Sequence, residues 1–328
     1  MAEKIPLRTS SLLVGAGLLF AAGALLGLAL PIRAELAGFQ TSLIGLIGSA
    51  FAAGYVAGCF YGPRLVASVG HIRVFGVMAA LVAVTALFNI LVVTPIAWIL
   101  VRAATGFAFA GGTMIIESWL SESATSQTRG RVFARYMMVN LASSVLGQLA
   151  VTVFSPSGFE PFAVVAILAC LALVPTALSS SRAPDPLHEV RLDIRQLGRV
   201  SPIAVVACFG VGLANGAFGT LAPVYAQSIG LPVGAVALLV AGAIVGGALM
   251  QAPVGKLSDR LERRWVLTGT ALVAAGLAFV VHLLDPRDPL TVILLVAALG
   301  GGMHTLYPVA VANANDRAKD GDFVAVSS

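Results

Sequence analysis

Two ionisable side chains lie within one long apolar stretch of the sequence, where a charge needs a physical reason. Arg102 and Glu117 are 15 residues apart, which on a helix is roughly 22 Å along the axis and about 60° around it. If the stretch spans a membrane, each charge costs at least about 2.5 kcal/mol and must face protein or water. Arg102 is then either a site for an anionic group or for proton coupling, which we favour, or a structural anchor whose stem reaches the interface.

Glu117 has two interpretations that the sequence leaves even. It is a proton carrier, or it is the acidic member of an ion pair with Arg129 or Arg131. Partial burial would favour its protonated form and make it a plausible protonation site. Three residues on the same helical face between the two charges are predicted to leave space beside the helix: Gly106, Phe109 and Thr113.

Three amides interrupt other apolar stretches. Asn140 and Gln148 are eight residues apart, which places them within about 80° of each other on a helix. Side-chain amides within a membrane commonly hydrogen-bond to a neighbouring helix, so we expect such bonds for both residues. Gln251 has the same interpretation in its own stretch.

Asn215 differs from these amides because four glycines surround it, and they would let its helix bend or unwind near the midplane. We therefore expect Asn215 to line a cavity. His304 and Tyr307 follow three consecutive glycines. For these two residues, a site and simple packing are equally good interpretations.

The composition indicates the elements that position these side chains. The chain has 58% hydrophobic and 11% charged residues and a mean hydropathy of +0.95, which leaves too little polar surface for a water-soluble body. Apolar runs of about 20 residues match a hydrocarbon core of roughly 30 Å. We predict an all-α integral membrane protein with ten spanning helices at 11–32, 41–61, 74–93, 95–118, 132–154, 161–178, 202–227, 232–254, 265–284 and 290–312.

The distribution of basic residues predicts the orientation. If the N-terminus is cytoplasmic, 17 of the 20 Lys and Arg residues lie on the cytoplasmic side, and only Arg33 and Arg287 lie outside. This asymmetry follows the positive-inside rule, so we expect a multi-pass membrane protein with a cytoplasmic N-terminus. Scattered basic loops do not indicate nucleic-acid binding, although the pI is near 9.4.

Known catalytic and metal-binding patterns do not occur. The sequence has no phosphate-binding loop, HExxH, GxSxG or clustered metal-ligand spacing, and its three cysteines lie separately in apolar runs. We therefore expect no enzyme activity, no cofactor and no metal site.

Two halves of similar plan are visible. A shift of about 190 residues places Gly62 to Arg73 on Gly255 to Arg264, and Gly111 with Gly112 on Gly301 with Gly302. The halves are residues 1–178 and 202–328, with residues 179–201 as a cytoplasmic linker. The first half contains six spans and the second four plus the start of a fifth, so the repeat predicts about 40 further residues and a 6 + 6 arrangement.

The charged stretch GKLSDRLERR resembles the loop signature of the major facilitator superfamily, between the second and third helix of each half. A weaker copy occupies the first half, where Val66 stands at the position of the signature's Asp. The resemblance implies that these loops gate conformational change, and that Asp259 meets the start of the fifth helix. The gating residues it implies are Gly62, Gly70, Arg73, Gly255, Asp259, Arg260, Arg263 and Arg264.

Further strings support the same resemblance. Arg102 with Gly106 resembles the family's Arg-x-x-x-Gly helix, which is often associated with proton coupling. IIESWL, RGRVFARYMMVNL and HTLYPVAVA resemble the YcaD-like bacterial group, which implies a location in the bacterial cytoplasmic (inner) membrane. The fifth span lacks the Gly-Pro repeat of drug–proton antiporters, which argues against a multidrug antiporter.

These observations predict a secondary active transporter that moves a small solute by alternating access, with proton coupling as a hypothesis. The implied partners are a small-molecule substrate, protons and the lipid bilayer, and we expect a monomer. The alternative is a non-transporting membrane sensor or a truncated, inactive transporter fragment. A channel is a weaker third option, because the charges cluster in loops rather than in rings along a pore.

Overall fold

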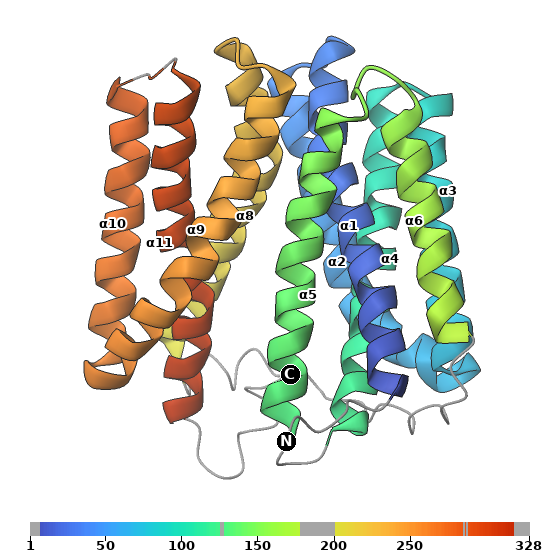
Figure 1. Cartoon of the computed structure of the whole chain (residues 1–328), viewed down its shortest axis with the longest axis horizontal. Coiled ribbons are helices and arrows are strands. Elements are labelled where there is room, and N and C mark those ends of the chain that lie inside the picture. Colours follow the sequence, from blue (N-terminus) through green and yellow to red (C-terminus); the bar gives the residue numbers. More distant parts are fainter. Residues whose placement is uncertain (1–6, 125–127, 178–200, 285, 287, 318–328) are drawn as a thin grey trace. The chain divides into compact units, whose positions relative to one another are not determined.

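The computed structural model describes residues 7–124, 128–177, 201–284, 286 and 288–317, and their regular secondary structure is helical (Figure 1). The N-terminal elements are α1 (Leu7–Leu36), α2 (Thr41–Val69), α3 (His71–Leu91), α4 (Pro95–Ser123), α5 (Arg129–Leu149), the 3-10 helix η1 (Ala150–Thr152) and α6 (Glu160–Ala177). The later elements are α8 (Pro202–Ser228), α9 (Val233–Arg260), α10 (Arg263–Leu284) and α11 (Pro289–Arg317).

Each predicted span coincides with one of these α-helices. Eight helices in the described part of the chain are long and apolar enough to cross a membrane, by length and composition. The other two are α5, which begins with the polar stretch RGRVFAR, and α6, whose apolar part is shorter. The prediction of an all-α membrane protein is confirmed, and the count of ten spans exceeds the eight that meet this criterion.

The charged turn predicted between the eighth and ninth spans is mostly helix, which corrects the sequence interpretation. Helix α9 continues through Arg260 and α10 begins at Arg263, so only Leu261 and Glu262 lie between them. At 28 residues α9 is about 42 Å long, which exceeds a hydrocarbon core of roughly 30 Å. The apolar window that marks a span therefore ends before the helix does.

In the first half, a single residue separates two helices. Gly70 ends α2 and precedes α3, and its φ of 88° lies in the left-handed region that favours glycine. Its backbone N–H donates to the carbonyl of Val66. The backbone conformation of this turn thus requires a glycine at position 70.

The chain divides into two compact units, Met1–Glu189 and Val190–Ser328. In the first unit α2 packs on α4, α1 packs on α5 and α6, and α3 packs on α4 and α6. The predicted linker, apart from Ser201, lies outside the described residues. So do residues 318–328, where the start of a further helix was expected.

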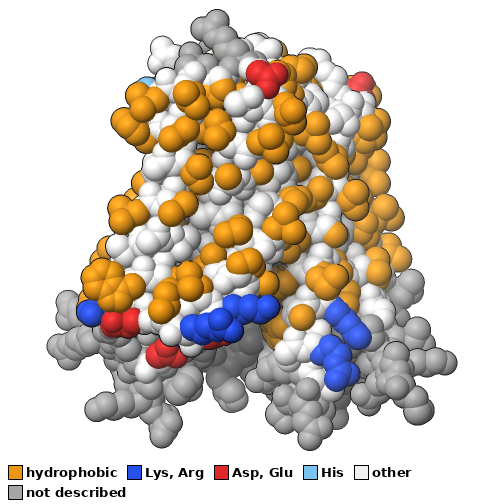
Figure 2. All heavy atoms as spheres, turned by 60° about the vertical axis from the view of Figure 1, so that its left-hand side comes forward, with side chains coloured by type: hydrophobic (Ala, Val, Ile, Leu, Met, Phe, Trp, Pro, Cys, Tyr) orange, Lys and Arg blue, Asp and Glu red, His pale blue; other side chains and the backbone are white. Residues whose placement is uncertain are grey.

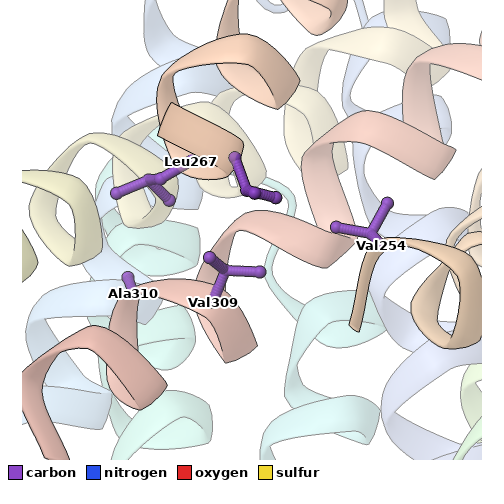
Figure 3. Packing of buried hydrophobic residues seen from close by; sticks show 5 residues of the cluster. Val254, Leu267, Val309 and Ala310 are labelled. Carbon is purple, nitrogen blue, oxygen red and sulfur yellow. The ribbon is translucent and has the colours of Figure 1, made fainter. Parts of the chain in front are cut away.

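In the second unit α11 is the central helix, because α8, α9 and α10 all pack on it. Figure 3 shows one core cluster of this unit, with side chains from α9, α10 and α11 directed toward one another. Part of α8 packs against the same cluster through Ile203 and Ala207. The cluster consists of Val254, Val266, Leu267, Val309 and Ala310.

Equivalent close contacts relate the two units. A Cβ added to Gly54 of α2 would lie 1.8 Å from the carbonyl oxygen of Ala103 on α4, and one added to Gly106 would lie 2.0 Å from that of Phe51. In the second unit a Cβ on Gly246 would lie 1.9 Å from the Ala297 oxygen. These glycines let the paired backbones touch, since a side chain at any of them would overlap the neighbouring carbonyl.

Gly300 is the fourth glycine with such a contact. A Cβ added to it would lie 2.2 Å from the carbonyl oxygen of Ala243. The contacts thus relate α2 to α9 by a shift of 192 residues, and α4 to α11 by 194. The glycine pairs that the sequence superposed make different contacts: Gly111 faces Met78 of α3, and Gly301 faces Met250 of α9. That detail of the predicted register is wrong, because small residues recur too often in such helices to fix a register alone.

The surface agrees with a membrane-spanning body. On the face shown in Figure 2, hydrophobic side chains are spread over the described surface, and Lys and Arg side chains gather near one end. Exposed large side chains such as Leu272, Phe279 and Leu294 would be costly in water but suit lipid contact.

Candidate functional site

The helix α4 carries the two charges with which the sequence analysis began, and it positions them from opposite ends. Arg102 lies seven residues after Pro95, and Glu117 lies six residues before Ser123. The helix is held on one side by α2 and on another by α3. Its functional face is therefore formed together with its neighbours.

Arg102 is partly buried, and its guanidinium carbon lies 4.5 Å from the ring centroid of Phe51 on α2. Among the described residues it forms no ion pair or hydrogen bond. A cation over an aromatic face is stabilised by about 0.5–2 kcal/mol. The ring of Phe51 thus supplies the partner for this charge, which the sequence analysis did not foresee.

The space predicted beside α4 is filled, which is a second correction. Gly106 lies against the backbone of Phe51, and the buried ring of Phe109 lies 6.2 Å from the ring of Phe51. On α1, a Cβ added to Gly23 would lie 2.6 Å from the Phe109 ring. Gly106 therefore allows α2 and α4 to pack closely and does not open a cavity.

Glu117 is exposed and accepts a hydrogen bond of 2.9 Å at Oε1 from the hydroxyl of Tyr136 on α5. It forms no ion pair with Arg131 in the described part of the chain. The side chain of Arg129, the other expected partner, lies outside the described residues. Among the described residues, the partner of this acidic group is thus a neutral donor.

Tyr136 is the main site residue that the sequence analysis missed. Its ring is 1% exposed and lies 5.6 Å from Phe20 on α1 and 6.2 Å from Phe133. A tyrosine hydroxyl that is buried usually finds a polar partner. The signal was therefore present as a tyrosine in a spanning helix, but the identity of its partner depends on helix packing.

A pair of hydroxyl groups lies one helical turn before Glu117. The side chain of Thr113 is 3.3 Å from the hydroxyl of Tyr55 on α2, and Thr113 also donates to the carbonyl of Phe109. Cys59 lies one turn after Tyr55 on α2. The hydrogen bond from Tyr136 and the Thr113–Tyr55 pair one turn away thus bring neutral polar groups of α5 and α2 to this end of α4.

The predicted interhelical bonds of the three amides are wrong in the described structure. Asn140 accepts a hydrogen bond from Ser144, four residues later on the same helix. Gln148 is buried, and its Oε1 has no hydrogen-bond partner. Gln251 is exposed and makes no hydrogen bond among the described residues.

Asn215 lies in the middle of α8, and its Oδ1 is buried without a hydrogen-bond partner among the described residues. The predicted unwinding does not occur, because α8 is helical from Pro202 to Ser228. A Cβ added to Gly212 or Gly216 would meet no atom within 4 Å. These glycines therefore leave open space beside the helix, and cavity lining by Asn215 stays a prediction.

His304 and Tyr307 occupy different environments on α11. His304 is partly buried against Gly247, where an added Cβ would lie 2.6 Å from the Cβ of the histidine. Tyr307 is exposed. The structure thus favours packing for His304.

The two signature segments differ in their chemistry. In the first unit Gly62 packs against Met114, and Val66 is buried, so an Asp at that position would place a charge in the core. Gly70 forms the turn, and Arg73 is exposed.

In the second unit Arg263 is the centre of a polar network. Its guanidinium donates to Asp316 at the end of α11, contacts Asp259 at 3.5 Å, and donates to Ser258 at 3.4 Å. Arg264 pairs with Glu262 at 2.7 Å. Two further signature residues on α9, Gly255 and Arg260, face open space and solvent, respectively.

A metal centre finds no support in the described residues, which contain no group of three or more His, Cys, Asp or Glu side chains placed to hold an ion. The candidate site thus contains the Glu117 carboxylate, which is hydrogen-bonded to Tyr136, and the Arg102 guanidinium, which lies over the ring of Phe51. Closely packed helix pairs hold both groups.

Comparison with known sequences identifies relatives. A family model described as the Major Facilitator Superfamily matches residues 12–326. An uncharacterised MFS-type transporter, YcaD, from Salmonella arizonae is 28% identical over 319 residues, which cover 96% of this chain and 82% of that protein. YcaD from Salmonella typhi is 28% identical over 322 residues, with the same coverage.

Comparison with solved structures shows the same fold. The nucleoside transporter NupG superposes with a TM-score of 0.78 at 13% identity, over 98% of this chain and 84% of that one. A D-xylose-proton symporter superposes with a TM-score of 0.70 at 15% identity, over 93% of this chain and 81% of that one. At such identities the likeness extends to the fold alone.

Proposed function

Since the chain belongs to the major facilitator superfamily, we propose that it is a secondary transporter that moves a small solute across the membrane by alternating access. Membership makes it a multi-pass membrane transporter and not an enzyme. The mechanism, the coupling and the solute are the parts that we propose. The distribution of its basic residues supports a cytoplasmic N-terminus by the positive-inside rule, and its bacterial relatives support a location in the inner membrane.

The observation that supports alternating access is the repeated packing of the two units. In each unit, two helices touch backbone to backbone through a reciprocal pair of glycines, Gly54 with Gly106 and Gly246 with Gly300. Such contacts resist deformation, because the atoms are already at van der Waals distance. Units of this kind are suited to move as rigid bodies, which is what alternating access requires.

We assign proton coupling to Glu117 rather than to Arg102. The carboxylate is exposed and changes charge by taking one proton, whereas the guanidinium stays charged and faces the ring of Phe51. Replacement of each residue separates the two roles. We expect Glu117→Gln to flatten the pH dependence of transport and Arg102→Ala to leave its shape unchanged.

Counterflow in proteoliposomes tests the function. Ligand screening by thermal shift identifies a solute, since a ligand that binds the folded state stabilises it. Liposomes loaded with that solute are then diluted into a trace of its labelled form. A carrier gives a transient accumulation of label above equilibrium, because inward label exchanges for outward unlabelled solute.

Two other outcomes would contradict the proposal. A monotonic approach to equilibrium without accumulation would indicate a channel. Binding without any movement of label would indicate the non-transporting sensor.

A further inference from the structure

The start of α3 buries a titratable ring that plays no part in the candidate site. His71 is the first residue of α3 and is only 2% exposed. Its ring stacks on the ring of Trp119 on α4, with centroids 6.1 Å apart and an angle of 22° between the planes. Trp119 is itself 4% exposed. Histidine is the side chain whose ordinary charge change falls between about pH 5 and 8, so the packing of this ring pair is tied to pH.

The polar surroundings of the imidazole suit its neutral form. The hydroxyl of Ser118 lies 3.5 Å from Nε2 of His71, and the indole of Trp119 offers an N–H donor but no acceptor. Both of these groups are neutral. The indole face attracts a cation, but that attraction does not replace the water that a charged imidazole loses on burial. Protonation therefore works against the buried position of the ring.

The charged groups around this end of α3 form no salt bridge with the ring in the described part of the chain. α3 packs on α4 and α6, and less extensively on α2. Among the described residues, the ring of His71 makes a hydrogen bond or a ring contact only with Ser118 and Trp119. The titratable groups that these helices bring to the same end, or nearest to it, are Arg64 on α2, Arg73 on α3, Glu117 and Glu122 on α4, and Cys170 on α6.

The closed arrangement of the two rings also leaves one donor unsatisfied. The indole N–H of Trp119 is buried and has no hydrogen-bond partner among the described residues. Such a donor destabilises the closed arrangement, and water would satisfy it once the imidazole leaves. The cost of uncovering Trp119 is therefore partly offset. The closed and open arrangements come closer in free energy, so that one proton can shift the balance between them.

A single residue connects His71 to the preceding helix. Gly70 separates α2 from α3 and has a φ of 88°. Its N–H donates to the carbonyl of Val66, and its own carbonyl accepts from the N–H of Val74. With no other residue between the helices, a displacement of the His71 ring acts at the point where α2 and α3 meet.

We propose that His71 and Trp119 form a pH-sensitive switch at the turn between α2 and α3. Neutral His71 stays against Trp119 and closes this end of α3. The protonated imidazole, having taken its proton from water, moves out to solvent, and water reaches the indole N–H. The inference goes beyond the proposed transport function and does not depend on it, since it concerns the packing of the first unit alone.

The accessibility of Trp119 to acrylamide measures the switch. The chain has three tryptophans, so the fluorescence of the purified full chain in detergent is recorded, and that of the Trp119→Phe variant is subtracted. We expect the quenching of Trp119 by acrylamide to rise severalfold from about pH 8 to about pH 5, and to return when the higher pH is restored. Circular dichroism over the same range should show unchanged helix content.

Histidine variants assign the effect to one residue. His71→Gln cannot take a proton in this range, so its acrylamide quenching is expected to be the same at both ends of the titration. His71→Phe keeps an aromatic ring on Trp119 and is expected to hold the indole protected throughout. His304→Gln is the matched control, because His304 is a partly buried histidine of the second unit, and it is expected to keep the full change.

Three results would overturn the switch. Acrylamide quenching that does not change with pH would show that the ring stays in place. A loss of fluorescence intensity without increased quenching by acrylamide would show that His71 takes its proton while still stacked on Trp119. An increase that persists in either His71 variant, or that accompanies a loss of helix, would assign the pH effect to another group or to unfolding. Counterflow tests transport separately from all of these results.

Discussion

At the scale of single residues, neutral groups complete the environment of both charges on α4. Phe51 lies against Arg102, and Tyr136 donates to Glu117. Each partner comes from a helix distant in sequence, so spacing along α4 did not reveal it. Of the three amides expected to bond between helices, Asn140 bonds within its own helix, to Ser144.

The contact between Arg102 and Phe51 can be measured by a double-mutant cycle. We expect Phe51→Leu to lower the thermal stability of the purified chain, and to lower it less when Arg102 is already alanine. The difference reports the cation–π contribution, which should be about 0.5–2 kcal/mol. Phe209→Leu is the control, because Phe209 is exposed on α8. Equal losses in both backgrounds would show that Phe51 stabilises only through its packing with Phe109 and Tyr55.

At the scale of helices, glycine placement decides which pairs pack closely. Gly54 tolerates no side chain beside Ala103, whereas Gly45 on the same helix has no atom within 4 Å of an added Cβ. The two positions look alike in the sequence. Only the packing of α2 on α4 distinguishes them.

Alanine substitution at these two glycines tests the close contact. We expect Gly54→Ala to destabilise the chain, because overpacking of a close contact costs about 1–3 kcal/mol. Gly45→Ala should leave stability equal or slightly higher, since alanine is the better helix former. Apparent melting temperatures in detergent are the measurement. A melting temperature for Gly54→Ala equal to that of Gly45→Ala would refute the backbone contact.

At the scale of the whole molecule, the two units share a plan but differ at their signature turns. The second unit holds its turn with Asp259, Arg263 and Asp316, whereas the first has buried Val66 at the corresponding place. A buried valine cannot take the role of an acidic latch. We therefore expect an acidic latch at the signature turn only in the second unit.

A cysteine reporter tests this asymmetry. With the three native cysteines replaced, Ala134→Cys places a thiol on the exposed start of α5, where the family resemblance puts the contact of Asp259. We expect Asp259→Asn to speed labelling of this thiol by an impermeant maleimide severalfold, because the latch is weakened. Val66→Ala should change the rate less. Equal labelling rates in the two variants would argue against a latch at Asp259.

The sequence by itself determined the class of molecule. Its apolar runs gave the positions of ten helices, its basic residues an expected orientation, and its repeat two halves. These properties follow from the sum of many residues in a bilayer, so they survive uncertainty at any one position. The charged stretch Gly255 to Arg264 was predicted wrongly as a turn. It is mostly helical, because α9 and α10 extend beyond the apolar residues by which the spans were recognised.

The tertiary structure alone decided which side chains meet. Tyr136 reaches Glu117 across 19 residues, and Phe51 reaches Arg102 across 51. Such contacts depend on the rotation and close approach of whole helices. Those are set by backbone contacts at a few glycines, such as Gly54 and Gly106, and not by the periodicity of either helix.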